Sequence, residues 1–410
     1  MKKIPLWILL TLMLASCSAM QAPKQAMAMS TPFGVPAQGQ PTVQTTRPPT
    51  ATAYVFQVKP TSTPQPSATP AGVNLTFGYG PQDFPADVNP LTGLPVIDSQ
   101  ALNRRPMAIK VTNFPRSVRP QYGLTLADHV YEYYLENLIT RFIAIFYGND
   151  ASRVGPVRSG RFFDEHIVRM YKAIFTFASA DYRVLDPWLE SDLKNLLVIE
   201  RESNCPPLCR IGPETQYNTL FADTQQLTQY IGELTADNDR QNLDGLRFEI
   251  ATPYSSQLGD QLDINYSFVS YNHWEYDGAR GRYLRFQESE DAQDSVKKFL
   301  PLEDQLTGEQ IAADNLIVLM IPHEYFVHTA TTEMVKMNFI GQGKAFAFRD
   351  GYMYPVQWNR ASQESLVTLT YSNGQPYPLK PGNVWFQVIG ETSPSSMPGE
   401  GAWAFDFRIP

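Results

Sequence analysis

Residues 130–147, VYEYYLENLITRFIAIFY, decide the fold of this chain. Apolar and polar side chains alternate over 130–136, which predicts a half-buried strand. Its two faces would carry Tyr131, Tyr133 and Leu135 on one side and Val130, Glu132, Tyr134 and Glu136 on the other. Thr140 to Tyr147 predicts a second strand, and the short gap between the two favours a hairpin. A tight hairpin would set Glu136 across from Arg141.

The residues around this hairpin predict an α/β unit. Apolar β runs occupy 107–112 and 173–178, and helical periodicity occupies 159–172, with Ser159 as the candidate N-cap. Two further stretches, 185–196 and 221–234, also have a helical pattern. We therefore expect an N-terminal mixed α/β domain over residues 86–240.

From about Asp244 the pattern changes to short strands. Hairpin-type turn pairs occur at Asp277-Gly278, Asp350-Gly351 and Asn373-Gly374. The expected strands are 265–271, 282–287, 315–322, 333–340, 344–349, 352–358 and 384–389. We expect a β-rich C-terminal domain over residues 241–410, so that the fold class of the whole chain is α/β (α+β).

The first 17 residues have the pattern of a lipoprotein signal peptide. Lys2 and Lys3 precede an apolar run over 4–14, and Leu14-Ala15-Ser16-Cys17 forms a lipobox. The run is too short for an ordinary transmembrane helix. Lipidation of Cys17 would anchor the chain to a bacterial membrane on its extracytoplasmic side. The alternative is an ordinary signal peptide with an incidental cysteine.

Residues 18–85 predict a disordered tether, because Pro, Thr, Gln, Ser and Ala dominate and apolar residues do not recur with any period. A flexible coil of this length spans on the order of 45 Å. It would hold the folded part away from the lipid headgroups.

Charge and cysteine content restrict the function classes. The 410 residues have a formal net charge of −8, and loss of Lys2 and Lys3 makes it −10. This balance argues against nucleic-acid binding and against a polybasic membrane contact. If Cys17 is lipidated, two cysteines are left, Cys205 and Cys209. We expect these two to form a local disulfide rather than a metal or redox site. We predict no cofactor and no metal.

The segment Val154-Gly-Pro-Val-Arg-Ser-Gly-Arg161 is the sharpest candidate site. Two arginines at the start of a helix are unfavourable unless a negative group lies with them. An anion would satisfy both the free N–H groups and the guanidinium groups. The expected ligand residues are Arg141, Arg158, Ser159 and Arg161, with Asn113, Arg119 and Gln121 from nearby loops. The alternative is pairing of these arginines with carboxylates of the same chain, namely Asp128, Glu132, Glu136, Asp164 or Glu165.

Enzyme signatures are sparse. There is no G-x-S-x-G elbow, phosphate loop, dinucleotide fingerprint or H-E-x-x-H motif. The alternative function is an enzyme that modifies envelope polymers with Asp128, Glu132 or Glu136 as the acid-base residue. Glu132 and Glu136 would lie about 13 Å apart along one strand, too far for a glycosidase pair.

One series of motifs resembles a known family. It runs through Asn89-Pro-Leu-Thr-Gly-Leu94, Arg105-Pro106, Asn113, Arg119-Pro-Gln121, Thr140-Arg-Phe142 and Gly155-Pro-Val-Arg-Ser-x-Arg161. In order and spacing these residues resemble the YerB-like bacterial lipoproteins, whose domain is of unknown function. The resemblance implies a lipid-anchored envelope protein with an N-terminal and a C-terminal part, and no established reaction. Together with the arginines, it favours binding of an anionic or glycan envelope component, or of an envelope protein.

Overall fold

A computed structural model describes residues 78–212, 216–233, 237–294 and 296–410. The predicted signal peptide, Cys17 and most of the predicted tether lie outside these residues. Among the helices in the described ranges, none is long and apolar enough to cross a bilayer.

The predicted hairpin is confirmed. Strands β4 (His129–Glu136) and β5 (Ile139–Phe146) pair antiparallel, with Glu132 opposite Phe142 and Tyr133 opposite Arg141. The expectation that Glu132 and Glu136 share a face is wrong. A β-bulge between Tyr134 and Glu136 shifts the register, and an extra residue reverses the alternation of side chains that follow it.

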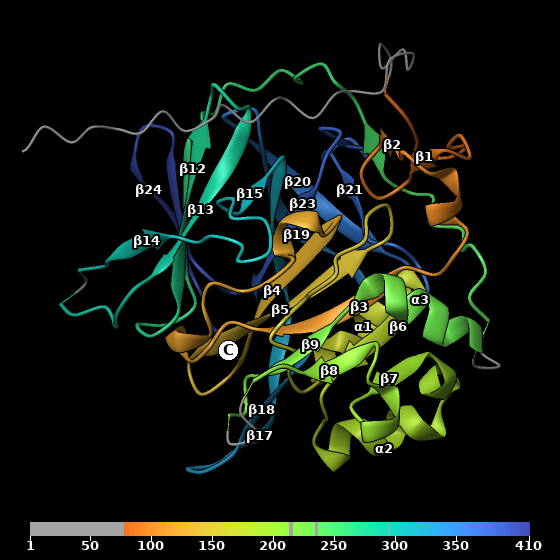
Figure 1. Cartoon of the computed structure of the whole chain (residues 1–410). Helices are drawn as coiled ribbons and strands as arrows, with labels where there is room; N and C mark the ends of the chain where they lie inside the picture. Colours follow the sequence, from red (N-terminus) through yellow and green to blue (C-terminus); the bar gives the residue numbers. More distant parts are fainter. Residues whose placement is uncertain (1–77, 213–215, 234–236, 295) are drawn as a thin grey trace, which may run out of the picture. The chain divides into compact units, whose positions relative to one another are not determined.

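This hairpin forms the middle of a mixed sheet (Figure 1). In the described residues, the strand order is β21-β20-β19-β16-β23-β4-β5-β3-β6-β7. The N-terminal half supplies β3 (Met107–Thr112), β6 (Ile174–Phe177) and β7 (Leu197–Ile199) beside the hairpin. The C-terminal half supplies β16 (Asn315–Ile321), β19 (Gly341–Arg349), β20 (Tyr352–Arg360), β21 (Thr368–Thr370) and β23 (Val384–Gly390).

The two halves meet at β23, which runs parallel to β16 on one side and to β4 on the other. The segments 86–240 and 241–410, which we expected to be separate domains, therefore contribute neighbouring strands to one sheet. Both faces of this central region are covered, so its strands are almost continuously apolar, as in β16 (NLIVLMI).

A second sheet comes from the C-terminal half alone. Its strand order in the described residues is β14-β13-β12-β11-β25-β24, with β15 beside β13. The strands are β11 (Gln261–Asn265), β12 (Tyr271–Asp277), β13 (Arg282–Glu288), β14 (Phe299–Pro301), β15 (Ala312–Ala313), β24 (Ser395–Gly399) and β25 (Ala402–Asp406). Residues 266–270 of the expected strand 265–271 instead form the connection between β11 and β12, because Ser267 accepts backbone hydrogen bonds that close a turn there.

Four short strand pairs complete the sheets in the part of the chain that the structure describes. They are β1 (Val88–Asn89) with β2 (Leu94–Pro95), β8 (Leu208–Arg210) with β9 (Leu220–Ala222), β10 (Arg247–Phe248) with β22 (Pro378–Leu379), and β17 (His323–His328) with β18 (Glu333–Met337). The expected disulfide is present between Cys205 and Cys209, with 4.8 Å between their Cα atoms.

The α-helices within the described ranges are α1 (Phe162–Tyr171), α2 (Tyr182–Glu190) and α3 (Thr224–Glu233). Helix α1 begins three residues later than predicted, and its N-cap is Arg161 rather than Ser159. The Asp164 carboxylate accepts the backbone N–H of Arg161 at 2.8 Å, whereas the preceding Gly160 N–H bonds to the Ser179 carbonyl. The segment predicted as a helix from Phe221 starts inside strand β9.

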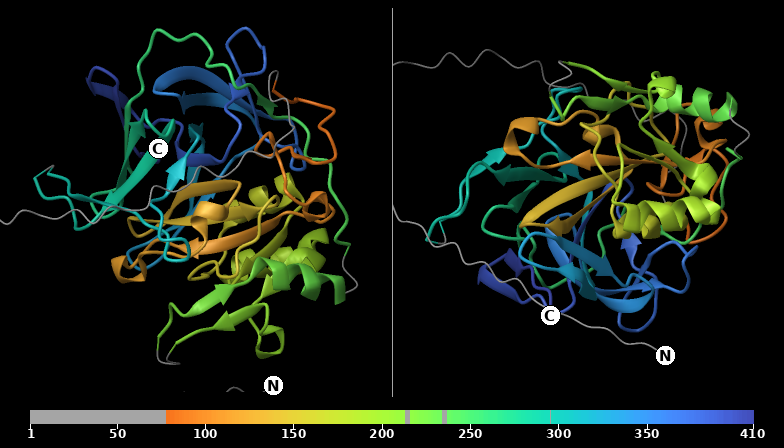
Figure 2. Two further views of the ribbon diagram at one scale, coloured as in Figure 1. Left: turned by 45° about the horizontal axis from the view of Figure 1, so that its top comes forward. Right: turned by 90° about the horizontal axis from the view of Figure 1, so that it is seen from below.

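Helix α1 and the second sheet cover opposite faces of the central sheet. On one face, Phe163 of α1 packs on Tyr133 with 4.6 Å between ring centroids. On the other face, Trp274 of β12 packs on Trp385 of β23 at 5.2 Å. Figure 2 shows both layers from two further directions. Every residue of β4 and β5 therefore faces one of two different environments, and this separates the predicted site residues.

Candidate functional site

Arg141, Arg158, Ser159 and Arg161 lie together at the start of α1, and we call this group the arginine site. Arg141 projects from β5 and donates from Nη1 to the Ser159 carbonyl at 2.8 Å. The segment before α1 lies along β3, because the Arg158 N–H donates to the Lys110 carbonyl at 3.0 Å. These backbone bonds hold residues 157–160 extended beside the sheet and bring the three guanidinium groups to one place.

Two of the nearby cations have carboxylate partners. Arg161 pairs bidentately with Glu136, which the bulge in β4 has turned toward this face. Lys110 of β3 is fully buried and binds Asp164 at 3.0 Å, and Tyr133 donates to the same carboxylate oxygen at 2.5 Å. Glu136 was expected to lie across from Arg141, but it pairs with Arg161 instead.

The other two cations have no such partner among the described residues. Arg141 and Arg158 form no ion pair there, and the Nε of each is buried without a hydrogen-bond partner. Arg141 is only 7% exposed. Three guanidinium groups and Lys110, whose pKa burial lowers to about 7 despite Asp164, thus share two carboxylates, and Arg141 and Arg158 leave an excess of positive charge at the site.

The pKa values follow the same division. Burial lowers the pKa of Arg141 to about 9, and the charges of Arg161 and Arg158 act in the same direction. The charge of Glu136 opposes this shift. Burial and the neighbouring charges of Arg161 and Arg210 also lower the pKa of Arg158. Burial alone would lower the pKa of Arg161, but Glu136 raises it above its usual value. The first two guanidinium groups therefore lack a counter-charge that the third one has.

The remaining predicted ligand residues lie on the opposite face of the sheet. Asn113 donates to the Glu132 carboxylate at 3.4 Å and to the Thr140 hydroxyl at 2.9 Å. Arg119 bonds to the Asn113 carbonyl and pairs with Glu288 at 2.6 Å. Gln121 is buried and donates to the Thr112 carbonyl at 3.1 Å. These three residues belong to an internal network and do not join the arginine site.

Glu132 is the centre of that network. Its carboxylate and the guanidinium of Arg285 are both 0% exposed and lie 2.9 Å apart. Asn272 and Thr140 also donate to this carboxylate, at 3.2 and 2.9 Å. The Arg285 guanidinium in turn lies 4.7 Å from the ring centroid of Trp385. The pair joins the two sheets through the core and has no access to solvent.

The three candidate acid-base carboxylates are not brought together. Asp128 lies at the opposite end of β4 from Glu136, buried, and accepts the backbone N–H groups of Tyr147 and Gly148 at 2.6 and 3.0 Å. Burial raises its pKa to about 6. Asp128, Glu132 and Glu136 each hold a different structural contact, and no two of them face a common space.

Sequence reasoning missed the partners Lys110, Arg285 and Glu288. Lys110 is the single charged residue in the apolar run 107–112, and this is a signal of a buried, paired charge. Arg285 alternates with Tyr283 and Gln287 on the inward face of β13, but nothing local to the sequence connects it with Glu132.

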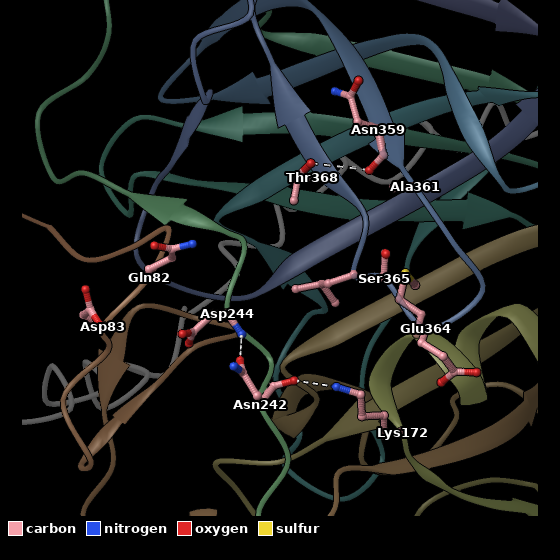
Figure 3. A pocket seen from close by; sticks show the side chains of 12 residues that line it. Gln82, Asp83, Lys172, Asn242, Asp244, Asn359, Ala361, Glu364, Ser365 and Thr368 are labelled. Carbon is pink, nitrogen blue, oxygen red and sulfur yellow. Dashed lines mark hydrogen bonds between the residues drawn. The ribbon is translucent and has the colours of Figure 1, made fainter.

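A separate hollow of about 610 Å³ lies elsewhere in the molecule (Figure 3). Carboxylates, carboxamides and hydroxyls line it, including Asp83, Asp244, Glu364, Asn242 and Asn359, with Lys172 as its cation. In the figure these side chains come from several segments and surround the space without converging on one point. Among the described residues, no group of three His, Cys, Asp or Glu side chains fits a metal ion. None of the ligand or acid-base residues predicted from the sequence lines this hollow.

Comparisons with known proteins agree with the fold. The chain is 24% identical over 327 residues to a protein of Bacillus subtilis (strain 168) named "Putative lipoprotein YerB", and the match covers 76% of this chain and 89% of that protein. The crystal structure of YerB from Bacillus subtilis matches with a TM-score of 0.61 at 22% identity, over 74% of this chain and 96% of that one.

Two family models match in succession. Residues 91–237 match the N-terminal domain, and residues 262–386 the C-terminal domain, of the protein of unknown function DUF3048. The arginine site falls within the first matched range. The chain belongs to the DUF3048 family, in which YerB of Bacillus subtilis is a relative with the same fold.

Proposed function

We propose that this protein is a lipid-anchored, extracytoplasmic lipoprotein whose folded part binds an anionic component of the cell envelope at the arginine site. The lipobox ending at Cys17 and the name of the relative support the anchor. The tether over residues 18–85 would then present the site at a distance from the membrane surface.

The positive charge of Arg141 and Arg158, which no carboxylate of the described residues compensates, carries the binding proposal. Buried guanidinium groups are costly unless a negative group compensates them. Arg141 and Arg158 have no carboxylate partner in the described residues, while their neighbours Arg161 and Lys110 each have one. An anion at this place would accept hydrogen bonds from both guanidinium groups at the N-terminal end of α1, where the helix dipole also favours it.

Arg158 provides the sharpest test, because its side chain is half-buried and makes no hydrogen bond with a described residue. The full chain is extracted from membranes in mild detergent, and binding of inorganic polyphosphate is measured by calorimetry. We expect Arg158→Ala to weaken binding about tenfold or more, since a hydrogen bond to a charged group contributes about 1.5–3 kcal/mol. The melting temperature should stay within a few degrees of wild type.

Arg280→Ala is the matched control. Arg280 lies in the turn between β12 and β13, is exposed, and among the described residues forms an ion pair with Asp277 alone. It should leave polyphosphate binding unchanged. Equal affinity of wild type and Arg158→Ala would contradict the binding proposal, and recovery of the chain from the cytosol would contradict the anchored location.

A further inference from the structure

The hairpin β17–β18 packs against helix α1, whose first residue follows Arg161 of the arginine site. Phe162 follows Arg161 in the chain and packs edge-on against Phe326 of β17, with 5.0 Å between the ring centroids. Lys336 of β18 places its Nζ 4.0 Å from the centroid of Phe326 and 4.8 Å from that of Phe162. The cationic site therefore continues into a group of aromatic rings that carries a further cation.

Phe326 is the extra residue of a β-bulge. Tyr325 pairs with Val335 and Val327 pairs with Met334, so Phe326 has no partner across the hairpin. Bulges of this kind redirect a side chain, and they are frequent next to functional sites. Here the bulge leaves Phe326 44% exposed, although an aromatic ring of this size gains free energy from burial.

The hairpin carries two more rings on its other face, where Tyr325 and His328 lie opposite Val335 and Glu333. Tyr325 is 38% exposed and stacks on His328 with 4.0 Å between centroids and 14° between planes. We call the contacting pair Phe162 and Phe326 the aromatic platform. Single exposed apolar residues are ordinary, but a grouped set of flat rings beside uncompensated cations marks a binding surface.

We propose that the arginine site and the aromatic platform together bind an anionic glycan. This inference rests on the proposed function and names its ligand class. A sugar ring presents a flat, partly apolar face that packs on the exposed face of Phe326, while a phosphate or carboxylate of the same glycan binds Arg158 and Arg141. Lys336 lies next to the platform and attracts a second negative group of a polymer. A bare inorganic anion would need the arginines alone and would gain nothing from the rings.

The test compares two variants on two kinds of probe by calorimetry with the full chain in detergent. The probes are a phosphodiester-linked glycan of the teichoic acid type and inorganic polyphosphate, which carries the same charge without sugar. Phe326→Ala should weaken glycan binding about fivefold to tenfold, as expected for loss of one aromatic contact, and leave polyphosphate binding unchanged. Arg158→Ala should weaken both. Tyr254→Ala, which removes a 92% exposed aromatic outside the platform, is the control and should weaken neither.

The outcomes separate the two proposals. If Phe326→Ala leaves glycan affinity unchanged, or weakens glycan and polyphosphate equally, the glycan inference is wrong while the arginine site stands. If Arg158→Ala affects neither probe, the anion site itself is wrong. An oligosaccharide of uronic acids in a parallel titration identifies the source of the charge, and binding of either glycan that depends on Phe326 supports the inference.

Discussion

Replacement of Glu132 by glutamine tests whether this residue is a structural pair or a catalytic acid. Glu132 is fully buried, and its carboxylate receives the charge of Arg285 and hydrogen bonds from Asn272 and Thr140. Glutamine keeps the shape but removes the negative charge, so that Arg285 is left as an uncompensated cation between the two sheets.

The expected cost is large. Breaking a buried ion pair by removing one partner destabilises a protein by about 3–5 kcal/mol. Because a loss of 1 kcal/mol lowers the melting temperature of a large domain by roughly 2–4 °C, the melting temperature should fall by roughly 10 °C. Thermal unfolding by circular dichroism and urea unfolding at 25 °C measure the two quantities independently.

Two comparisons make the result specific. Glu275→Gln removes a carboxylate from the exposed side of β12 and should change the free energy of unfolding by less than about 0.5 kcal/mol. Glu132→Gln combined with Arg285→Met removes both charges and should recover part of the loss. The reasoning is refuted if Glu132→Gln melts within about 2 °C of wild type.

Two further predictions concern pH and the disulfide. Burial raises the pKa of Glu288 from 4.5 to about 7, against the opposing charge of Arg119. The folded chain then keeps a proton on Glu288 that the unfolded chain loses, so the free energy of unfolding should fall as pH rises from 4.5 to about 7. The fall should be smaller in Glu288→Gln. Urea titrations at several pH values that show no difference between wild type and Glu288→Gln would contradict this prediction. Reduction of Cys205–Cys209, which closes a loop of five residues, should cost at most about 2 kcal/mol, and a loss of cooperative thermal unfolding on adding reductant would contradict this.

The sequence predicts the elements better than their connections. The hairpin 129–146, helix α1 and six of the seven strands expected in the C-terminal half follow from periodicity, because local alternation decides which residues are buried. The bulge in β4 does not, since Asn137 and Leu138 take positive φ values in the turn without the glycine that usually signals such a turn. That single extra residue placed Glu136 on the face opposite to the one expected.

Long-range pairing accounts for the rest of the difference. Arg158 and Arg161 are neighbours in the chain, so their proximity could be predicted. The charge balance of the site depends instead on Lys110 and Glu136, which reach it from β3 and β4. The separation of Asn113, Arg119 and Gln121 from the arginines depends on which sheet face each strand presents. No short-range pattern encodes that choice.

The late position of β23 in the chain has a consequence for biogenesis. Residues 384–390 insert between β16 and β4, so the edge of β4 stays open until nearly the whole polypeptide has been synthesised. Pairing between strands separated by more than 240 residues makes folding slow. Because the N-terminal part is synthesised first, the chain passes through a stage in which one edge of β4 is unpaired and prone to aggregation. A fragment that stops at residue 237, where the first family match ends, should therefore require a chaperone or precipitate.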